Sequence, residues 1–185
     1  MATYLITGSS RGLGFALVKQ LVALPHSQVR TVFATARSEN SAALQELVHQ
    51  HTNRAVLVKL DVTSQPSIST AVAKVEEHLR GQGLDVLINN AGIQTICPAG
   101  MQAVEDLNEI FNANVTSVHM VTRAFLPLLS KGGQKKVVNM LVFPRNHKLH
   151  TFPDRVLDRQ RQVRLPGRPA TQPHLHRRIR SRKRR

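Results

Sequence analysis

The feature that most constrains the fold is a glycine-rich stretch, Thr-Gly-Ser-Ser-Arg-Gly-Leu-Gly, at residues 7–14. It follows the short apolar run 4–6 and leads into a helical pattern of apolar residues over 15–23. A strand, a glycine-rich turn and a helix in this order are typical of dinucleotide-phosphate sites, because glycines let backbone N–H groups approach and the helix N-terminus supplies unpaired donors. The spacing G-x-x-x-G-x-G is not the more usual G-x-G-x-x-G, so the stretch alone is also compatible with a simple tight turn.

The hydrophobic pattern of the first 140 residues alternates between the periods of strands and helices. Strands are predicted at 3–6, 29–35, 55–60, 84–88 and 136–140. Leu13, Leu17 and Leu21 mark a first helix, and further helices are predicted around 44–51, 68–79 (with Ser64 as N-cap and Pro66 in the first turn) and 104–130. Strands that alternate with helices predict a doubly wound parallel sheet, whose ligands bind at the carboxyl ends of the strands.

Charge divides the chain into two segments. Residues 1–140 have a net charge of +3, whereas residues 141–185 have a net charge of +12, with 12 Arg and five Pro. We therefore predict one dinucleotide-binding domain over 1–140 and a disordered basic tail over 141–185. The run 177–185 is compatible with nucleic-acid binding, but an unselected disordered tail is the favoured explanation, because basic runs are a motif of low specificity.

Few features point to a membrane, a disulfide or a metal. No apolar run is long enough to span a bilayer, and the chain begins directly with a strand pattern, so we expect a cytoplasmic protein. Cys97 is the single cysteine and cannot form an internal disulfide. His119 has no Cys, Asp or Glu at helical spacing, so we expect it to be an ordinary helix residue, and no metal site is predicted.

The end of the second strand carries arginine where an acidic residue is usual. In dinucleotide folds an acid about 20 residues after the glycines binds the ribose 2′-hydroxyl. Here Arg37 stands at that strand end and Arg11 lies within the glycine stretch. A guanidinium pairs with a 2′-phosphate, which a carboxylate would repel. The pattern favours NADP(H) over NAD(H), unless Arg37 is simply a solvated surface charge.

Two further strand ends carry polar or small residues. Asp61 follows the third strand and could accept a hydrogen bond from an adenine amino group, or form an Asx turn before the next helix. The fourth strand ends at Asn-Asn-Ala-Gly, residues 89–92, where small residues would allow a ligand to approach closely. Each feature by itself could be only a turn.

In combination, residues 7–14, Asp61-Val62, residues 89–92 and Asn114-Val115 resemble the short-chain dehydrogenase/reductase family over about residues 3–140. The glycine stretch is most similar to the carbonyl-reductase-like branch found in fungi. The resemblance implies hydride transfer between a nicotinamide dinucleotide and a carbonyl or alcohol. It also implies homo- or hetero-oligomers formed through the helix 104–130. The residues it predicts to bind cofactor are Gly8, Ser10, Arg11, Gly12, Leu13, Gly14, Arg37, Asp61, Val62, Asn90, Ala91 and Gly92. The residue matching Asn114 supports the family's catalytic lysine through a water.

The resemblance stops before the family's proton-transfer groups. The family uses a Tyr-x-x-x-Lys pair and a serine at the end of the preceding strand, and these are absent from this chain. Its one tyrosine is Tyr4, and the next serine after the strand 136–140 is Ser181. We therefore expect a truncated, catalytically impaired domain, or a non-catalytic cofactor-binding or dimerising fragment. The abrupt change near Asn139 suggests a reading-frame change, a retained intron or a gene-model error. The fifth strand should be an exposed sheet edge, which favours aggregation.

Overall fold

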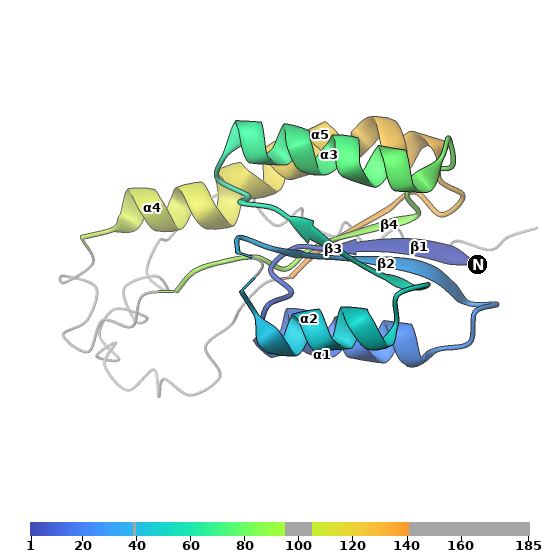
Figure 1. Cartoon of the computed structure of the whole chain (residues 1–185). Coiled ribbons are helices and arrows are strands. Elements are labelled where there is room, and N and C mark those ends of the chain that lie inside the picture. Colours follow the sequence, from blue (N-terminus) through green and yellow to red (C-terminus); the bar gives the residue numbers. More distant parts are fainter. Residues whose placement is uncertain (39, 95–104, 141–185) are drawn as a thin grey trace, which may run out of the picture. The chain divides into compact units, whose positions relative to one another are not determined.

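The computed structural model describes residues 1–38, 40–94 and 105–140, all within one compact unit, Met1–Val142. Predictions for Cys97 and for the basic tail (residues 141–185) lie outside the described residues. The strands are β1 (Ala2–Ile6), β2 (Val29–Ala36), β3 (Ala55–Lys59), β4 (Val86–Asn89) and β5 (Lys136–Asn139). The helices are α1 (Gly12–Ala23), α2 (Ala42–Gln50), α3 (Gln65–Leu79), α4 (Leu107–Phe111) and α5 (Ser117–Lys131), with a π-helical turn, η2 (Asn112–Thr116), between the last two (Figure 1).

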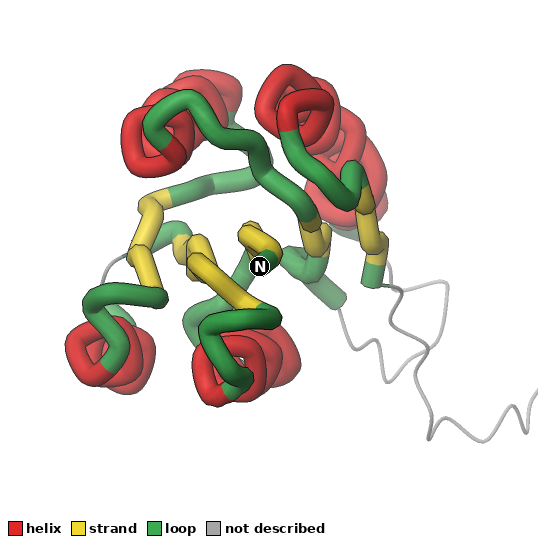
Figure 2. The backbone as a smooth tube through the Cα atoms, turned by 90° about the vertical axis from the view of Figure 1, so that its right-hand side faces the viewer, coloured by secondary structure: helices red, strands yellow, loops and turns green. Residues whose placement is uncertain are grey.

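The strands form one parallel sheet in the order β3-β2-β1-β4-β5. Helices α1 and α2 cover one face of the sheet, and α3 and α5 cover the other (Figures 1 and 2). The chain builds β1, β2 and β3 outward in one direction and then returns to the other side of β1 for β4 and β5. This reversal lies next to the glycine stretch, where doubly wound sheets bind ligands. The predicted Rossmann-type fold is confirmed.

Alternating side chains of the strands supply both layers of the core. Leu5 and Phe33 pack with α3 and α5, whereas Ile6 and Val32 pack with α1 and α2; all four are fully buried. Such double burial explains why consecutive residues of β2, such as Val32, Phe33 and Ala34, are apolar and buried rather than alternating with exposed polar ones.

The helix boundaries follow local chemistry. The Oγ of Ser64 accepts a hydrogen bond from the Ser67 N–H, and Pro66 lies in the first turn of α3, as predicted. The leucine repeat correctly marks α1, but it does not form the buried face. Val18 and Val22 are buried, whereas the Leu13 side chain is 55% exposed beside the glycine stretch.

The helix predicted over 104–130 contains a π-helical turn in the structure. Its described part consists of α4, η2 and α5, and it ends at Lys131 before Gly132, as expected. The backbone at Asn112 and Thr116 keeps right-handed helical angles, so the helix continues through a wider turn. Nothing in the apolar periodicity distinguishes an i→i+5 turn, and such turns occur frequently at functional sites.

A buried carboxylate joins the amino ends of β1 and β4 to the turn before β5. Asp85 is 8% exposed and accepts hydrogen bonds from the backbone N–H groups of Thr3 (2.8 Å), Gly133 (2.7 Å) and Gln134 (3.2 Å). The Thr3 hydroxyl also donates to it at 3.0 Å. Burial raises the pKa of Asp85, but these donors outweigh burial, and the net pKa is lowered.

Strand β5 is an exposed edge in the described part of the chain. It pairs with β4 along one side, and all four of its residues are exposed, including the apolar Val137 and Val138. The expectation of an exposed edge at the fifth strand therefore holds for the described residues. Among those residues, none of the helices has both the length and the apolar character needed to cross a bilayer.

Candidate functional site

The glycine loop (residues 7–14) connects β1 to α1 with two left-handed glycines. Gly8 has φ +69°, and a Cβ at this position would lie 2.9 Å from the Ala91 Cα. A Cβ on Gly14 would collide with the Gly8 carbonyl oxygen. Gly12 has φ +58°, and the position of its missing Cβ faces open space. The loop is thus closely packed on its inner side and leaves room on its outer side.

Hydrogen bonds fasten the glycine loop to the Asn-Asn turn (residues 89–92). The Thr7 hydroxyl oxygen accepts from the backbone N–H groups of Asn90 and Ala91, both at 2.9 Å. The Asn90 side-chain amide donates in return to the carbonyls of Thr7 (2.9 Å) and Gly8 (3.1 Å). Two segments more than eighty residues apart in sequence are therefore held as one rigid rim.

A cavity of about 390 Å³ lies along this rim at the carboxyl ends of the strands. We name it the carboxyl-edge cavity. Its volume falls within the usual range of small-molecule sites, which is roughly 300–1,000 Å³. All twelve residues that the sequence analysis predicted to bind cofactor line it: Gly8, Ser10, Arg11, Gly12, Leu13, Gly14, Arg37, Asp61, Val62, Asn90, Ala91 and Gly92.

The carboxylate of Asp61 forms an Asx turn, which was one of the two roles predicted for it. Its Oδ1 accepts from the Thr63 hydroxyl at 2.7 Å and from the Thr63 N–H at 3.0 Å. These two bonds are the main cause of the lowered pKa of Asp61, and the nearby charge of Arg37 lowers it further. Asp61 is therefore an anion near an exposed guanidinium, and both side chains belong to the lining of the cavity. The turn leaves the carboxylate at the cavity wall, so an adenine contact stays a prediction.

Asn114 lies in the π-helical turn and does not line the carboxyl-edge cavity. Its Oδ1 accepts from the Ile93 N–H at 2.9 Å, and its Nδ2 donates to the Ile93 carbonyl at 2.8 Å. A Cβ on Gly92 would lie 2.9 Å from the same Oδ1. The side chain holds the segment after the Asn-Asn turn against η2. Its predicted role toward a catalytic lysine stays a prediction.

Several residues of the site were not among the predicted cofactor-binding residues, and three of them have identifiable roles or positions. Thr7 fastens the loop, and its position directly before the first glycine was the available signal. Asn89 is buried, and its amide donates to the Thr122 hydroxyl (3.0 Å) and the Asn139 side chain (2.9 Å). Glu109 reaches the cavity from α4 and had no sequence signal.

The described residues contain no cluster of three or more His, Cys, Asp or Glu side chains suited to a metal. His119 is exposed on α5, where the sequence analysis expected an ordinary helix residue. The strand end at which the family carries its serine is followed by residues outside the described part of the chain. The site therefore consists of the carboxyl-edge cavity and the hydrogen bonds that fix its rim.

Known proteins are similar to this chain in sequence and in fold. The family model for short chain dehydrogenases matches residues 2–143. The short-chain dehydrogenase/reductase AacuF of Aspergillus aculeatus is 37% identical over 148 residues, which are 76% of this chain and 54% of AacuF. The short chain dehydrogenase gsfK of Penicillium aethiopicum is 38% identical over 138 residues, covering 72% of this chain and 53% of gsfK.

Solved structures agree with these sequence relatives. An NADPH-bound carbonyl reductase from chicken fatty liver aligns with a TM-score of 0.63 and 37% identity, over 71% of this chain and 49% of that protein. The carbonyl reductase Sniffer of Drosophila melanogaster aligns with a TM-score of 0.63 and 34% identity, over 71% and 53%. This chain thus spans about half the length of the relatives it matches. With its glycine loop, its Asn-Asn turn and its parallel sheet, the chain belongs to the short-chain dehydrogenase/reductase family of oxidoreductases.

Proposed function

We propose that the carboxyl-edge cavity binds NADP(H). The observation that carries this proposal is the convergence of the glycine loop, Arg37, Asp61 and the Asn-Asn turn on one cavity at the carboxyl ends of the strands. A dinucleotide needs such a combination, because its pyrophosphate, adenosine and nicotinamide ribose lie along several neighbouring strand ends. The NADPH named for the solved chicken carbonyl reductase supports the choice of cofactor class.

The glycine loop fits a pyrophosphate. The open space beside Gly12 allows a phosphate to approach the backbone, and α1 begins at this glycine. The preceding residue, Arg11, makes no side-chain capping bond, so the first N–H groups of α1 keep their capacity to bind an anion. Arg11 also lines the cavity with its own positive charge.

The charges at the adenosine end favour a 2′-phosphate. Arg37 is exposed at the end of β2 and lines the cavity, at the position where NAD-specific folds carry an acid. A guanidinium can donate two parallel hydrogen bonds to a phosphate, whereas a neutral ribose hydroxyl cannot accept such a charged pair of bonds. We infer a preference for NADP(H) over NAD(H) from this position.

Bound nicotinamide would supply the hydride of a carbonyl reduction or an alcohol oxidation. The residues of this chain would hold the cofactor, but the chain has no Tyr-x-x-x-Lys pair to move the accompanying proton. Its one tyrosine, Tyr4, packs in β1 against the core shared with α1 and α2. General acid–base groups contribute about 10²–10⁴-fold to rate, so we expect cofactor binding with at most trace turnover.

Thermal melts of the full chain test the binding proposal. NADPH should raise the Tm more than NADH does, because a ligand stabilises the folded state more when it binds that state more tightly. Arg37→Gln should weaken NADPH about 5–10-fold and leave NADH nearly unchanged, since one charge-assisted contact is lost. Arg123→Gln removes an exposed arginine of α5 outside the cavity and serves as the matched control. Equal shifts with both cofactors, or none, would contradict the proposal.

A dimerising role is favoured by a separate observation. Leu107, Phe111 and Val115 recur at every fourth residue through α4 and η2, and their side chains are 64%, 58% and 50% exposed. Side chains four apart lie on one helical face, so these three form an apolar stripe suited to a partner helix. We propose association through this stripe with a second copy or a full-length relative. Phe111→Glu should abolish a dimer detected by sedimentation, whereas Lys19→Glu on α1 should not.

A further inference from the structure

A second pocket, of about 580 Å³, lies at the opposite edge of the sheet. Its walls come from residues near the start of β2 and β3, the last two turns of α3 and the loop that follows α3. We name it the amino-edge pocket. Three lining side chains carry a positive charge, Arg30, Lys74 and Arg80, and one, Glu77, carries a negative charge. Thr31 of β2 lines this pocket and Ala36 of the same strand lines the carboxyl-edge cavity, so roughly 16 Å of strand separates the two.

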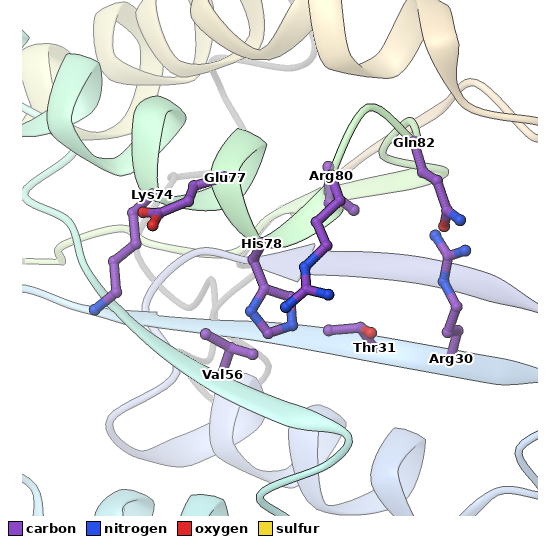
Figure 3. Close-up of a pocket in the computed structure, with 9 residues that line it drawn as sticks. Arg30, Thr31, Val56, Lys74, Glu77, His78, Arg80 and Gln82 are labelled. Atoms are coloured by element: carbon purple, nitrogen blue, oxygen red, sulfur yellow. The ribbon is translucent and has the colours of Figure 1, made fainter.

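The two arginines approach the pocket from different elements. Figure 3 shows Arg30 extending from β2 toward Gln82, while Arg80 extends from the end of α3 toward β2, beside the His78 ring and Thr31. Lys74 extends from α3 toward β3. Thr31 lies between the two guanidinium groups in this view. Among the described residues neither guanidinium forms an ion pair, so both present hydrogen-bond donors to the pocket.

Irregular backbone at both arginines accounts for these directions. The register between β1 and β2 shifts at this point, because Ala2 pairs with Val29 and Thr3 with Thr31, which leaves Arg30 as an additional residue. Bulges of this kind redirect a side chain and occur frequently next to binding sites. Arg80 caps α3 in the left-handed conformation, with φ +49°, where glycine would be the unstrained choice.

The amino-edge pocket keeps a net positive charge, because its lining holds three cationic side chains and one carboxylate, Glu77, which forms no ion pair with them among the described residues. Among the described residues, the ion pair joins Lys131 to Glu76, both outside the lining of this pocket. The floor is preorganised, because the His78 ring packs edge-on against the buried Phe33, with centroids 5.4 Å apart and planes at 89°. A rigid, cationic, donor-rich hollow favours anions that carry several acceptor oxygens.

We propose that the amino-edge pocket binds a small phosphorylated ligand, independently of the dinucleotide site. The arginines supply the charge and the paired donors that phosphate oxygens accept, and the Thr31 hydroxyl and the Gln82 amide add neutral donors. Val56 offers an apolar surface for the organic part of a phosphate ester. The volume lies within the range of small-molecule sites.

The test is a titration of the full, isotope-labelled chain with inorganic pyrophosphate at about 0.15 M ionic strength, which is close to the physiological value. NMR should show saturable shifts in the amides of Thr31, Val56 and residues 77–82. Arg80→Asn and Arg30→Gln should each weaken the affinity at these amides at least about fivefold. Asparagine accepts the left-handed conformation, so Arg80→Asn keeps the backbone of the helix end. Parallel titration with ADP distinguishes an organic phosphate, which should bind more tightly and shift Val56, from inorganic phosphate.

Location separates this site from other phosphate-binding parts of the chain. The control Arg123→Gln removes an equal charge from the exposed face of α5 and should leave the amino-edge affinity unchanged. Shifts confined to the glycine loop or to the basic tail would overturn the proposal. It would also be overturned if shifts failed to saturate, or if all three arginine variants weakened binding equally. The Tm of each variant, measured without ligand, shows that it folds.

Discussion

At the scale of single residues, Gly14 and Gly12 of the glycine loop are restricted to glycine by different physical causes. Gly14 is excluded from carrying a side chain by the Gly8 carbonyl oxygen, which is backbone and cannot rotate away. Gly12 has space around it, and only its φ of +58° disfavours other residues. One position is thus fixed by packing and the other by backbone conformation.

Gly14→Ala should therefore destabilise the fold by about 2–4 kcal/mol, in the range of overpacked sites, because the start of α1 has to move away from the Gly8 carbonyl and the Asn90 amide. Gly12→Ala should destabilise it by only about 1–2 kcal/mol, the usual penalty of a left-handed non-glycine residue. Urea unfolding of both variants measures the difference. A larger loss for Gly12→Ala would show that the loop packs differently.

Asp85 should make the fold sensitive to acid. Its folded pKa lies below the ordinary 3.8, because the hydrogen bonds that it accepts outweigh its burial. A group with a lowered folded pKa contributes stability above its unfolded pKa, and this stability is lost as the pH falls through the folded value. Stability should thus decline below about pH 4.

Asp85→Asn should remove that part of the acid dependence and destabilise the protein at pH 7 by about 2–3 kcal/mol, since charge-assisted bonds to Thr3, Gly133 and Gln134 are weakened. Unfolding free energies between pH 3 and 7 measure both effects. Glu105→Gln, at a residue exposed on the chain before α4, is the matched control. If the free energy of unfolding of Asp85→Asn fell at low pH as much as that of the wild type, other carboxylates would be responsible for the pH dependence.

At the scale of elements, the strands were predictable and the π-helical turn in the long helix was not. All five strands lie within two residues of their predicted bounds, because buried parallel strands stand out as apolar runs between turns. The π-helical turn at Asn112–Thr116 left no mark in the apolar periodicity. The bulge at Arg30 and the carboxylate bonds of Asp85 also depend on contacts between distant segments, which local sequence does not encode.

The exposed edge strand β5 should promote association between copies. Among the described residues, the outer side of β5 has no strand partner, and together with two exposed valines it forms a surface to which another strand can add. Val138→Lys should reduce concentration-dependent light scattering, because a charge on an edge opposes strand addition, and it should change stability by no more than about 0.5 kcal/mol.

The control for this prediction is Gln20→Lys, which adds the same charge at an exposed position of α1. It should leave the light scattering unchanged, so that a local effect on β5 is distinguished from a general gain in net charge. If both variants reduced scattering equally, association would not depend on the edge of the sheet.

At the scale of the whole described unit, the sequence predicted the carboxyl-edge cavity and missed the amino-edge pocket. The first was accessible because its residues follow strand ends, and a parallel sheet brings strand ends to one edge. The second combines residues from the start of β2, the start of β3 and the end of α3, which share no motif and no common spacing. Sequence patterns therefore predicted the carboxyl-edge cavity, whose position follows from the sheet topology. They did not predict the amino-edge pocket, which depends on the directions of side chains from separate elements.

The central position of β1 also bears on how this protein is made. β1 is synthesised first, yet its second neighbour is β4, and 82 residues separate Thr3 from Asp85. While translation is under way, β1, β2 and β3 can pair early, but the Thr7 hydroxyl has no Asn90 or Ala91 N–H to bind. The proposed capacity to bind a dinucleotide should thus be acquired late on the ribosome and in one step, when the segment from Asp85 to Ala91 joins both ends of the first strand.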